Sequence, residues 1–378
     1  MTLVESGCST YARDEFLAIA QGQITRDIRK SCNPSRPTVV YSSNMSRDPV
    51  RDVVRGLTSL EMTFVNNSNL QWAAHSGYVG QITYADTIFP CFAFLSGMSP
   101  APMRRSVGLI GIGLSLQTVS AFANGKRLRI PGVLQRLGLA SMIANEPSLE
   151  ILKKFNGLPL VVLWYAISLL GSTSANPLAH PDYPSNDLSN TAQTKIDTFV
   201  FGQHLHTPTF DPEGLLGSLT TAASMLIGQS FQKQTASTSE KALESIGMIA
   251  VGEALHYLIP KYAPISKSLW TPSFLLVTSG TSMLKYLAVE ALVPYLPKLV
   301  QSLLVDVGRR SLEVYIVSTL LTIMVKYGGD RGLYSRGKRF LENVVGQASS
   351  ELVMNLTITG LVAASAKFMV SQRIRLQW

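Results

Sequence analysis

His75 is the residue of this chain best placed for acid–base chemistry. It stands in a stretch, residues 66 to 83, that has no Lys, Arg, Asp or Glu, and this stretch leads directly into Tyr84-Ala85-Asp86. Histidine is the side chain that exchanges protons most readily near neutral pH. A histidine in a short loop is also often a surface residue or a hydrogen-bonded one, so both interpretations are kept for His75.

Two arginines place positive charge where it is costly. Arg136 lies inside the apolar run 130–145, and Arg129 directly precedes that run. Seven helical residues turn through about 700°, so the two guanidinium groups share one helix face within about 20°. A charge inside a membrane costs at least about 2.5 kcal/mol and usually faces a cavity, a partner or a substrate.

Other polar residues fall near the ends of expected helices. Asp211-Pro212-Glu213 has the pattern of a helix start, with Asp at the N-cap, Pro in the first turn and an acid near the positive end of the dipole. Lys267 and Trp270 fit an anchor at a membrane boundary. Each of these patterns therefore has a purely structural interpretation.

Two weaker patterns complete the survey of polar residues. Asp52 and Arg55 have the spacing of an ion pair at a helix end, which contributes little if it is exposed. His204 and His206 alone are a weak metal signal, and the three cysteines lack metal-ligand spacing. We expect no metal site.

The composition is that of a membrane protein. Of the 378 residues, 46% are hydrophobic and only 15% are charged. Most of the apolar runs are near the roughly 20 residues that a helix needs to cross hydrocarbon. The sequence predicts an all-α polytopic membrane helix bundle with about ten transmembrane helices, at residues 57–72, 84–102, 106–123, 130–145, 157–175, 213–231, 242–260, 269–293, 302–325 and 351–370.

The distribution of Lys and Arg predicts the orientation. If both termini are cytosolic, 20 basic residues lie inside and 11 outside, as the positive-inside rule requires. We therefore expect a flexible cytosolic tail (1–50), a transmembrane domain (51–370) and a short cytosolic tail (371–378). The net charge of +9 is attributed to topology and lipid contact, and no nucleic-acid partner is expected. On this topology, the polar motifs converge on the non-cytosolic face.

Several motifs occur together and in order, and through them the chain resembles a known family. It resembles the catalytic domain of the heparan-α-glucosaminide N-acetyltransferase family of multi-pass transmembrane acyltransferases, over roughly residues 47 to 325. The motifs are Asp52-Val53-Val54-Arg55-Gly56, Phe64-Val65-Asn66, His75 with Thr83-Tyr84-Ala85-Asp86 and Phe89-Pro90, Arg129-Ile130-Pro131-Gly132-Val133-Leu134-Gln135-Arg136, Phe210-Asp211-Pro212-Glu213-Gly214 and Lys267-Ser268-Leu269-Trp270.

The resemblance implies transfer of an acetyl group from acetyl-CoA, supplied on the cytosolic side, to an amino sugar on the lumenal side. His75 matches the family's essential histidine and would be the general base or, less readily, the acyl carrier. Asp86 would hold its imidazole in the required tautomer, and Asn66 would donate to the oxyanion.

The remaining candidates are assigned to binding. Arg129, Arg136 and Arg55 are expected to bind acetyl-CoA through its phosphates, and either of the first two could instead stabilise the oxyanion. The residues expected to contact the acceptor or to support the site are Asp211, Glu213, Lys267 and Trp270.

Two alternatives stay open. Glu61, Glu253, His256 and Asp306 lie within expected spans, which would also suit a transporter of a polar metabolite. The stretch after His75 differs from the family pattern, as a degenerate acyltransferase that only binds ligand would. A homodimer is possible, and the sequence does not identify the membrane, which could be lysosome- or vacuole-like or the plasma membrane.

Overall fold

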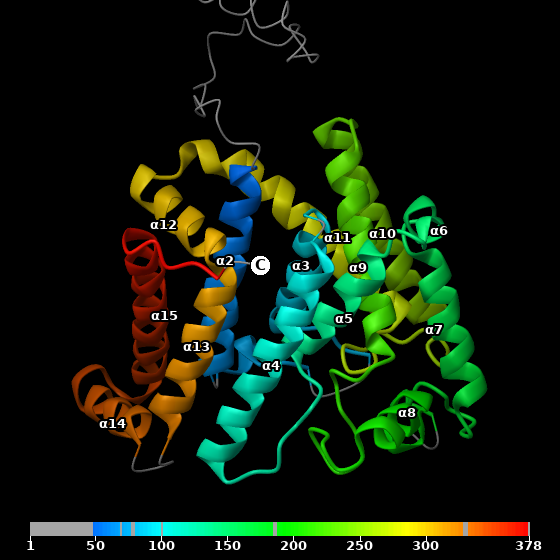
Figure 1. The fold of residues 1–378 in the computed structure, drawn as a ribbon, viewed down its shortest axis with the longest axis horizontal. Coiled ribbons are helices and arrows are strands. Elements are labelled where there is room, and N and C mark those ends of the chain that lie inside the picture. The colour runs from blue at the N-terminus through cyan, green and yellow to red at the C-terminus, as the bar shows by residue number, and fades with distance from the viewer. Residues whose placement is uncertain are drawn as a thin grey trace, which may run out of the picture. The chain divides into compact units, whose positions relative to one another are not determined.

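The protein is described by a computed structural model over residues 48–68, 70–76, 80–99, 101–183, 187–327 and 332–376. The regular elements in those ranges are all helical, with no β-strand among them (Figure 1). The predicted all-α class is therefore confirmed. Ser46–Trp378 forms one compact unit. Residues 1–47 of the predicted tail (1–50) lie outside the described residues. The other domain limits stay predictions.

Fourteen α-helices build the described part of the chain, joined by three short 3₁₀ turns at Gln71–Ala73, Leu188–Asn190 and Val293–Tyr295. The α-helices are α2 (Pro49–Asn67), α3 (Tyr84–Gly97), α4 (Met103–Asn124), α5 (Val133–Asn145), α6 (Glu150–Lys154), α7 (Leu158–Gly171), α8 (Ala192–Phe201), α9 (Gly217–Lys233), α10 (Thr238–Leu258), α11 (Pro272–Leu292), α12 (Lys298–Arg309), α13 (Ser311–Lys326), α14 (Leu333–Val345) and α15 (Gln347–Ser371).

One predicted span is wrong as a single helix. The apolar run 302–325 is divided at Arg310, whose backbone N–H donates to the carbonyls of both Asp306 and Val307 at 3.2 Å. The helix tightens there and ends, because α12 must follow α2 while α13 takes another course. Gly56 and Gly308 bring α12 and α2 together, since a Cβ on Gly308 would lie 1.8 Å from the Asp52 carbonyl oxygen.

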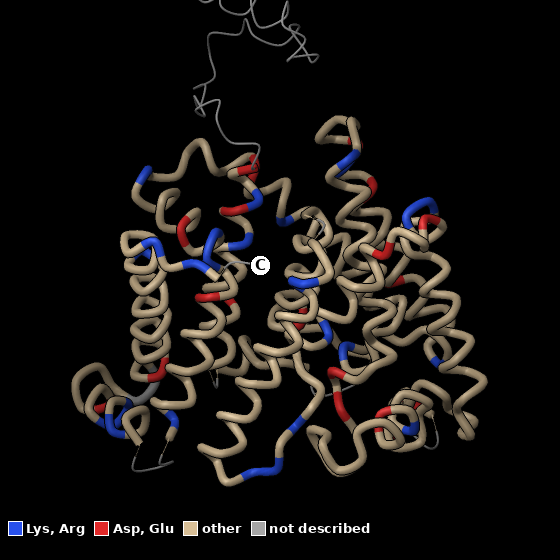
Figure 2. Tube along the Cα trace, viewed as in Figure 1, with Lys and Arg blue, Asp and Glu red and all other residues tan. Residues whose placement is uncertain are grey.

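The other nine runs each correspond to one helix, but their number as membrane spans stays a prediction. Two of the described helices are long and apolar enough to cross a membrane, α4 and the part of α15 from Ser349 to Ser371. Figure 2 shows that their charged residues lie near the helix ends. Helix α7 is apolar but shorter. Three helices, α6, α8 and α14, form in segments that the sequence predicts as loops.

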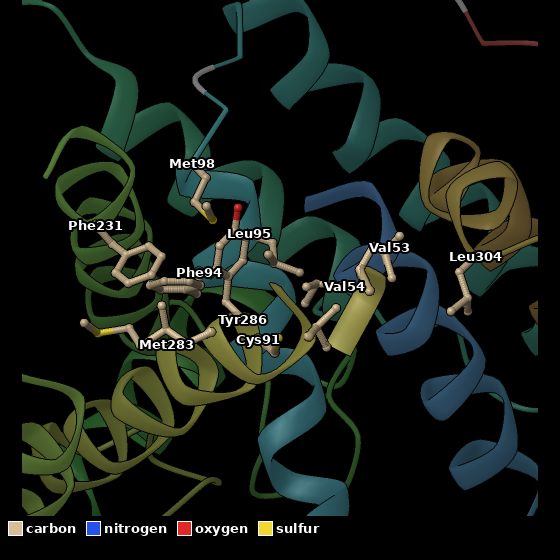
Figure 3. Packing of buried hydrophobic residues seen from close by; sticks show 13 residues of the cluster. Val53, Val54, Cys91, Phe94, Leu95, Met98, Phe231, Met283, Tyr286 and Leu304 are labelled. Carbon is tan, nitrogen blue, oxygen red and sulfur yellow. The ribbon is translucent and has the colours of Figure 1, made fainter. Parts of the chain in front are cut away.

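Helix α3 lies at the centre of the packing and carries part of the candidate site. Phe94 of α3 packs on Phe231 of α9 with ring centroids 5.4 Å apart, and Phe231 packs edge-on against Tyr286 of α11 at the same distance (Figure 3). Met283 belongs to the same buried cluster. These contacts fix α3 against α9 and α11, and they thereby fix the position of its first turn.

Candidate active site

The site is organised around Asp86, in the first turn of α3. Its carboxylate is fully buried. Oδ2 accepts hydrogen bonds from the backbone N–H of Ser76 at 3.0 Å and from the N–H and hydroxyl of Thr83 at 3.1 and 3.0 Å. An acid at this position satisfies N–H groups that a helix start leaves without partners. Asp86 therefore closes the preceding loop onto the helix and leaves Oδ1 for other contacts.

His75 and Lys267 both contact the second carboxylate oxygen. His75 Nδ1 lies 3.1 Å from Asp86 Oδ1, and the His75 side chain is 46% exposed. Lys267 Nζ lies 3.0 Å from Asp86 Oδ1 and 2.7 Å from His75 Nδ1. A half-exposed imidazole is thus attached through Nδ1 to a buried acid, which leaves its other nitrogen, Nε2, to meet a ligand.

The loop that carries Lys267 is held by its own hydrogen bonds. Thr271 caps α11, and its hydroxyl donates to the Pro264 carbonyl at 2.6 Å. Ser273 Oγ donates to the Ala263 carbonyl at 2.7 Å. These buried bonds give the loop one conformation, so Lys267 reaches the His75–Asp86 pair from a fixed position.

Arg129 holds the turn formed by residues 211–214. Its Nε and Nη2 donate to the two carboxylate oxygens of Asp211 at 2.8 and 2.5 Å, and Nη2 also pairs with Glu213. Asp211 is buried and also accepts from the backbone N–H groups of His206 and Glu213, at 2.8 and 2.9 Å. Two-pronged arginine–carboxylate pairs of this kind are strong and directional.

Arg136 holds the same turn from its backbone side. Its Nη2 donates to the carbonyls of Pro212 at 2.7 Å and Gly214 at 3.2 Å. The guanidinium lies 5.2 Å from the ring centroid of Trp270, a cation–π distance. Arg136 is 3% exposed, so the charge inside the apolar run has backbone and aromatic partners.

Two sequence-based interpretations are corrected here. Asp211 does not begin a helix, because α9 starts at Gly217 and the Asp211 side chain is engaged by Arg129. Trp270 does not anchor the protein at a membrane boundary. It is 1% exposed and packs edge-on against Phe89 and Phe274, with centroids 5.2 and 5.3 Å apart.

A cavity of about 340 Å³ lies between α2, α3, α4, α5 and α13. Arg55 and Arg105 line one end of it, and Asn66 and Thr322 line the other. On α2 the lining extends from Arg55 to Asn66, eleven residues further on, which is about 16 Å along the helix. The cavity therefore follows the long direction of the helices, with positive charge at the end where α2 begins.

The described lining of this cavity does not include His75, Asp86 or Lys267. The two features share helix α3, because Phe89 lines the cavity and lies three residues, about 4.5 Å along the helix, after Asp86. Phe89 also packs on Trp270, three residues after Lys267. The cavity wall and the His75 cluster are thus built on the same turn of α3.

The candidates therefore fall into three groups. His75, Asp86 and Lys267 form one cluster. A second cluster consists of Arg129, Arg136, Asp211, Glu213 and, through Arg136, Trp270. Arg55 and Asn66 face the cavity, and the predicted pair of Arg55 with Asp52 is present at 3.7 Å. Their chemical roles stay predictions.

Sequence reasoning missed three participants. Arg105 lines the cavity but in the sequence is only one of two loop arginines. Thr83 donates hydrogen bonds to the Asp86 carboxylate. It stands three residues before an acid at a helix start, and this capping-box pattern could have identified it. Asp197 is buried beside Gly214, and no sequence signal indicated this.

The fold and the site together define an all-helical protein with helices suited to a membrane and a histidine–carboxylate pair beside an elongated cavity. No family model matches the chain. The chain is 24% identical to human heparan-alpha-glucosaminide N-acetyltransferase over 352 aligned positions, which cover 70% of this chain and 53% of that protein. The chain spans about half the length of this curated relative, and the similarity indicates a distant relationship to an N-acetyltransferase.

Proposed function

We propose that this chain is a membrane-embedded acyltransferase that moves an acetyl group from acetyl-CoA to an amino sugar or related glycan acceptor on the non-cytosolic face. The observation that carries the proposal is the His75–Asp86 pair in a chain distantly related to an N-acetyltransferase. Both termini would be cytosolic, and the protein would act in the bilayer as a monomer or homodimer.

In the proposed reaction, His75 is the general base. With Nδ1–H donating to Asp86, the lone pair on Nε2 removes a proton from the acceptor amine. The amine nitrogen bonds to the thioester carbonyl carbon, the carbon–sulfur bond breaks, and the CoA sulfur leaves with the proton from His75. If His75 carries the acetyl group instead, the same tautomer is needed, because Nε2 must attack the carbonyl.

The cavity is the proposed site for acetyl-CoA. Arg55 and Arg105 at one end suit the phosphates of the nucleotide part, and the long uncharged arm of CoA suits the channel between the helices. Asn66 lines the far end and is our proposed donor to the oxyanion. The cavity lining thus contains two cations suited to the phosphates and one amide donor suited to the oxyanion.

The second cluster is proposed to form the acceptor side. The side chains of Arg129 and Arg136 bind the turn 211–214. We therefore propose that they stabilise this turn, in place of the predicted contact with CoA. Glu213, 15% exposed at its side chain, is the carboxylate of this cluster that a positively charged amino sugar would meet.

The test is thioester consumption in detergent-solubilised protein, with labelled acetyl-CoA and a panel of amino sugars. His75→Ala is expected to lower the rate at least about 100-fold, the range for loss of a general base. His206→Ala, another exposed histidine on the same face, is the matched control and should keep the wild-type rate. A folded His75→Ala protein with full activity would contradict the proposal.

The cavity also favours a second candidate, a transporter of a polar metabolite. Its lining combines arginine, serine and asparagine side chains with apolar ones along much of α2. The predicted intramembrane acid Glu61 is paired with Lys285 of α11, which a charge-coupled carrier could use. Solute uptake into proteoliposomes that persists in His75→Ala, without any thioester consumption by the wild type, would favour transport.

A further inference from the structure

Helix α14 presents three different surfaces around its axis. At 100° per residue, Leu333, Phe340 and Val344 fall within an arc of about 40°. All three are more than 60% exposed. Contiguous exposed apolar side chains of this kind mark a surface that is covered by a partner or a membrane.

The neighbouring arc on one side faces the protein. Tyr334 is buried, and its hydroxyl lies 3.5 Å from Asn355 Oδ1 of α15. Gly337 rests on α15 as well, because a Cβ there would lie 3.0 Å from Met354 Cε. This arc fixes the rotation of α14, so the exposed apolar arc cannot turn inward.

The neighbouring arc on the other side is basic. Arg336 and Arg339 lie about 40° and 100° from Phe340, and both are exposed. Lys338 lies across the helix and pairs with Glu351 at 3.6 Å. Going around the helix, the order is therefore protein contact, exposed apolar arc and basic arc.

The position of α14 identifies what covers the apolar arc. Helix α15 starts at Gln347, directly after the corner at Gly346, and its segment Ser349–Ser371 is long and apolar enough to cross a membrane. The start of a span marks the boundary of the hydrocarbon. Figure 1 shows α14 lying across the ends of α13 and α15, which places it at that boundary.

We propose that α14 is an interfacial helix that binds an anionic bilayer surface, on the non-cytosolic side in the topology proposed above. Leu333, Phe340 and Val344 enter the acyl boundary, and Arg336 with Arg339 binds phospholipid headgroups that carry net negative charge. This contact is separate from acetyl transfer, and its test does not use activity.

The test uses the full chain, with its native cysteines replaced, reconstituted into nanodiscs. A cysteine at Phe340 carries an environment-sensitive fluorophore, and a cysteine at Asn343, an exposed position on the basic side, is the matched control. The label at 340 should be blue-shifted and quenched by lipids with a nitroxide near the headgroup. The label at 343 should be quenched mainly by aqueous iodide.

The charge component is tested with nitroxide-labelled phosphatidylglycerol and phosphatidylcholine at equal mole fraction. Phosphatidylglycerol should be enriched at position 340 by about fivefold or more, since each basic residue near an anionic surface contributes about fivefold. R336Q/R339Q should abolish the enrichment and keep the blue shift. Equal iodide access at 340 and 343, or phosphatidylglycerol enrichment that survives R336Q/R339Q, would each overturn the proposal.

Discussion

Lys267 Nζ lies 2.7 Å from His75 Nδ1 and 3.0 Å from Asp86 Oδ1, so one ammonium group contacts both members of the pair. An ammonium group has only donors to offer. Its bond to Nδ1 requires that nitrogen to accept, which places the imidazole proton on Nε2. The tautomer needed for catalysis carries its proton on Nδ1 instead. Lys267 therefore opposes that tautomer in the observed arrangement.

Lys267→Met should move the imidazole proton of His75 from Nε2 to Nδ1, because Asp86 is then the remaining partner of Nδ1. The ¹⁵N resonances of histidine-labelled protein report this tautomer directly. The variant should also lose about 3 kcal/mol of stability, since Asp86 becomes a buried carboxylate without its positive partner. Lys261→Met, in the same loop but in contact with Tyr183 and Tyr262, is the control. Identical tautomer populations in wild type and Lys267→Met would refute the competition.

Arg105→Gln tests the proposed orientation of acetyl-CoA. Loss of one cation at the end of the cavity should raise KM for acetyl-CoA about tenfold with little change in kcat, because a phosphate contact remote from the thioester binds ground state and transition state alike. Steady-state kinetics at varied acetyl-CoA concentration measure this. Arg104→Gln removes a neighbouring exposed arginine that does not line the cavity, and it should leave KM unchanged. Equal effects of the two substitutions would argue against the assignment.

Apolar run length predicted the helices well, and its failures have local causes. Each of the ten runs is helical, because burying a backbone among apolar side chains requires internal hydrogen bonding. The break at Arg310 was missed, because it depends on how closely α12 follows α2, which a run of apolar residues does not encode. Helix α14 was missed because its apolar residues are interrupted by Arg336, Lys338 and Arg339, and charge counting classed the segment as a loop.

The sequence indicated which residues belong to the candidate site better than it indicated which of them contact one another. His75 and Asp86 are eleven residues apart and could be associated from the sequence. Lys267 is 192 residues from His75, and Arg129 is 82 residues from Asp211. The sequence predicts that these motifs lie on one membrane face, but it does not predict which of their residues are in contact. Which acid pairs with which base depends on the packing of α3, α5 and the loops, which no local pattern records.

Gly308→Ala tests the contact between α2 and α12 that breaks the predicted span. A methyl group there would meet the Asp52 carbonyl oxygen, at 1.8 Å in the unrelaxed structure, and the backbone of neither helix can yield easily. We expect a loss of about 1 to 3 kcal/mol, the usual cost of overpacking, measured by thermal unfolding in detergent. Gly360→Ala in α15 meets nothing within 4 Å and should be neutral or stabilising. Equal melting temperatures for wild type and Gly308→Ala would disprove the close approach.

Asp197 predicts a pH dependence of stability. It lies on α8, between two expected spans, and is fully buried. Oδ1 accepts from the Leu215 N–H at 2.9 Å, while Oδ2 has no hydrogen-bond partner among the described residues. Burial raises the pKa of Asp197 to about 6, although the Leu215 hydrogen bond and the charge of Arg136 lower it. At neutral pH the fold therefore holds a carboxylate that is less favourable in the folded chain than in the unfolded chain.

Between the usual pKa of 3.8 and about 6, the folded chain binds this proton more tightly than the unfolded chain. Stability from this group consequently falls as pH rises from 4 to 6, and the two-unit difference amounts to about 3 kcal/mol. Asp197→Asn should remove that fall, so the variant matches wild type near pH 4 and exceeds it by up to about 3 kcal/mol at pH 7. Chemical unfolding in detergent at both pH values measures this, with Asp182→Asn as control, because the Asp182 side chain is 87% exposed. If the Asp197→Asn and wild-type stability curves stay parallel between pH 4 and 7, the Asp197 carboxyl is not the buried acid described here.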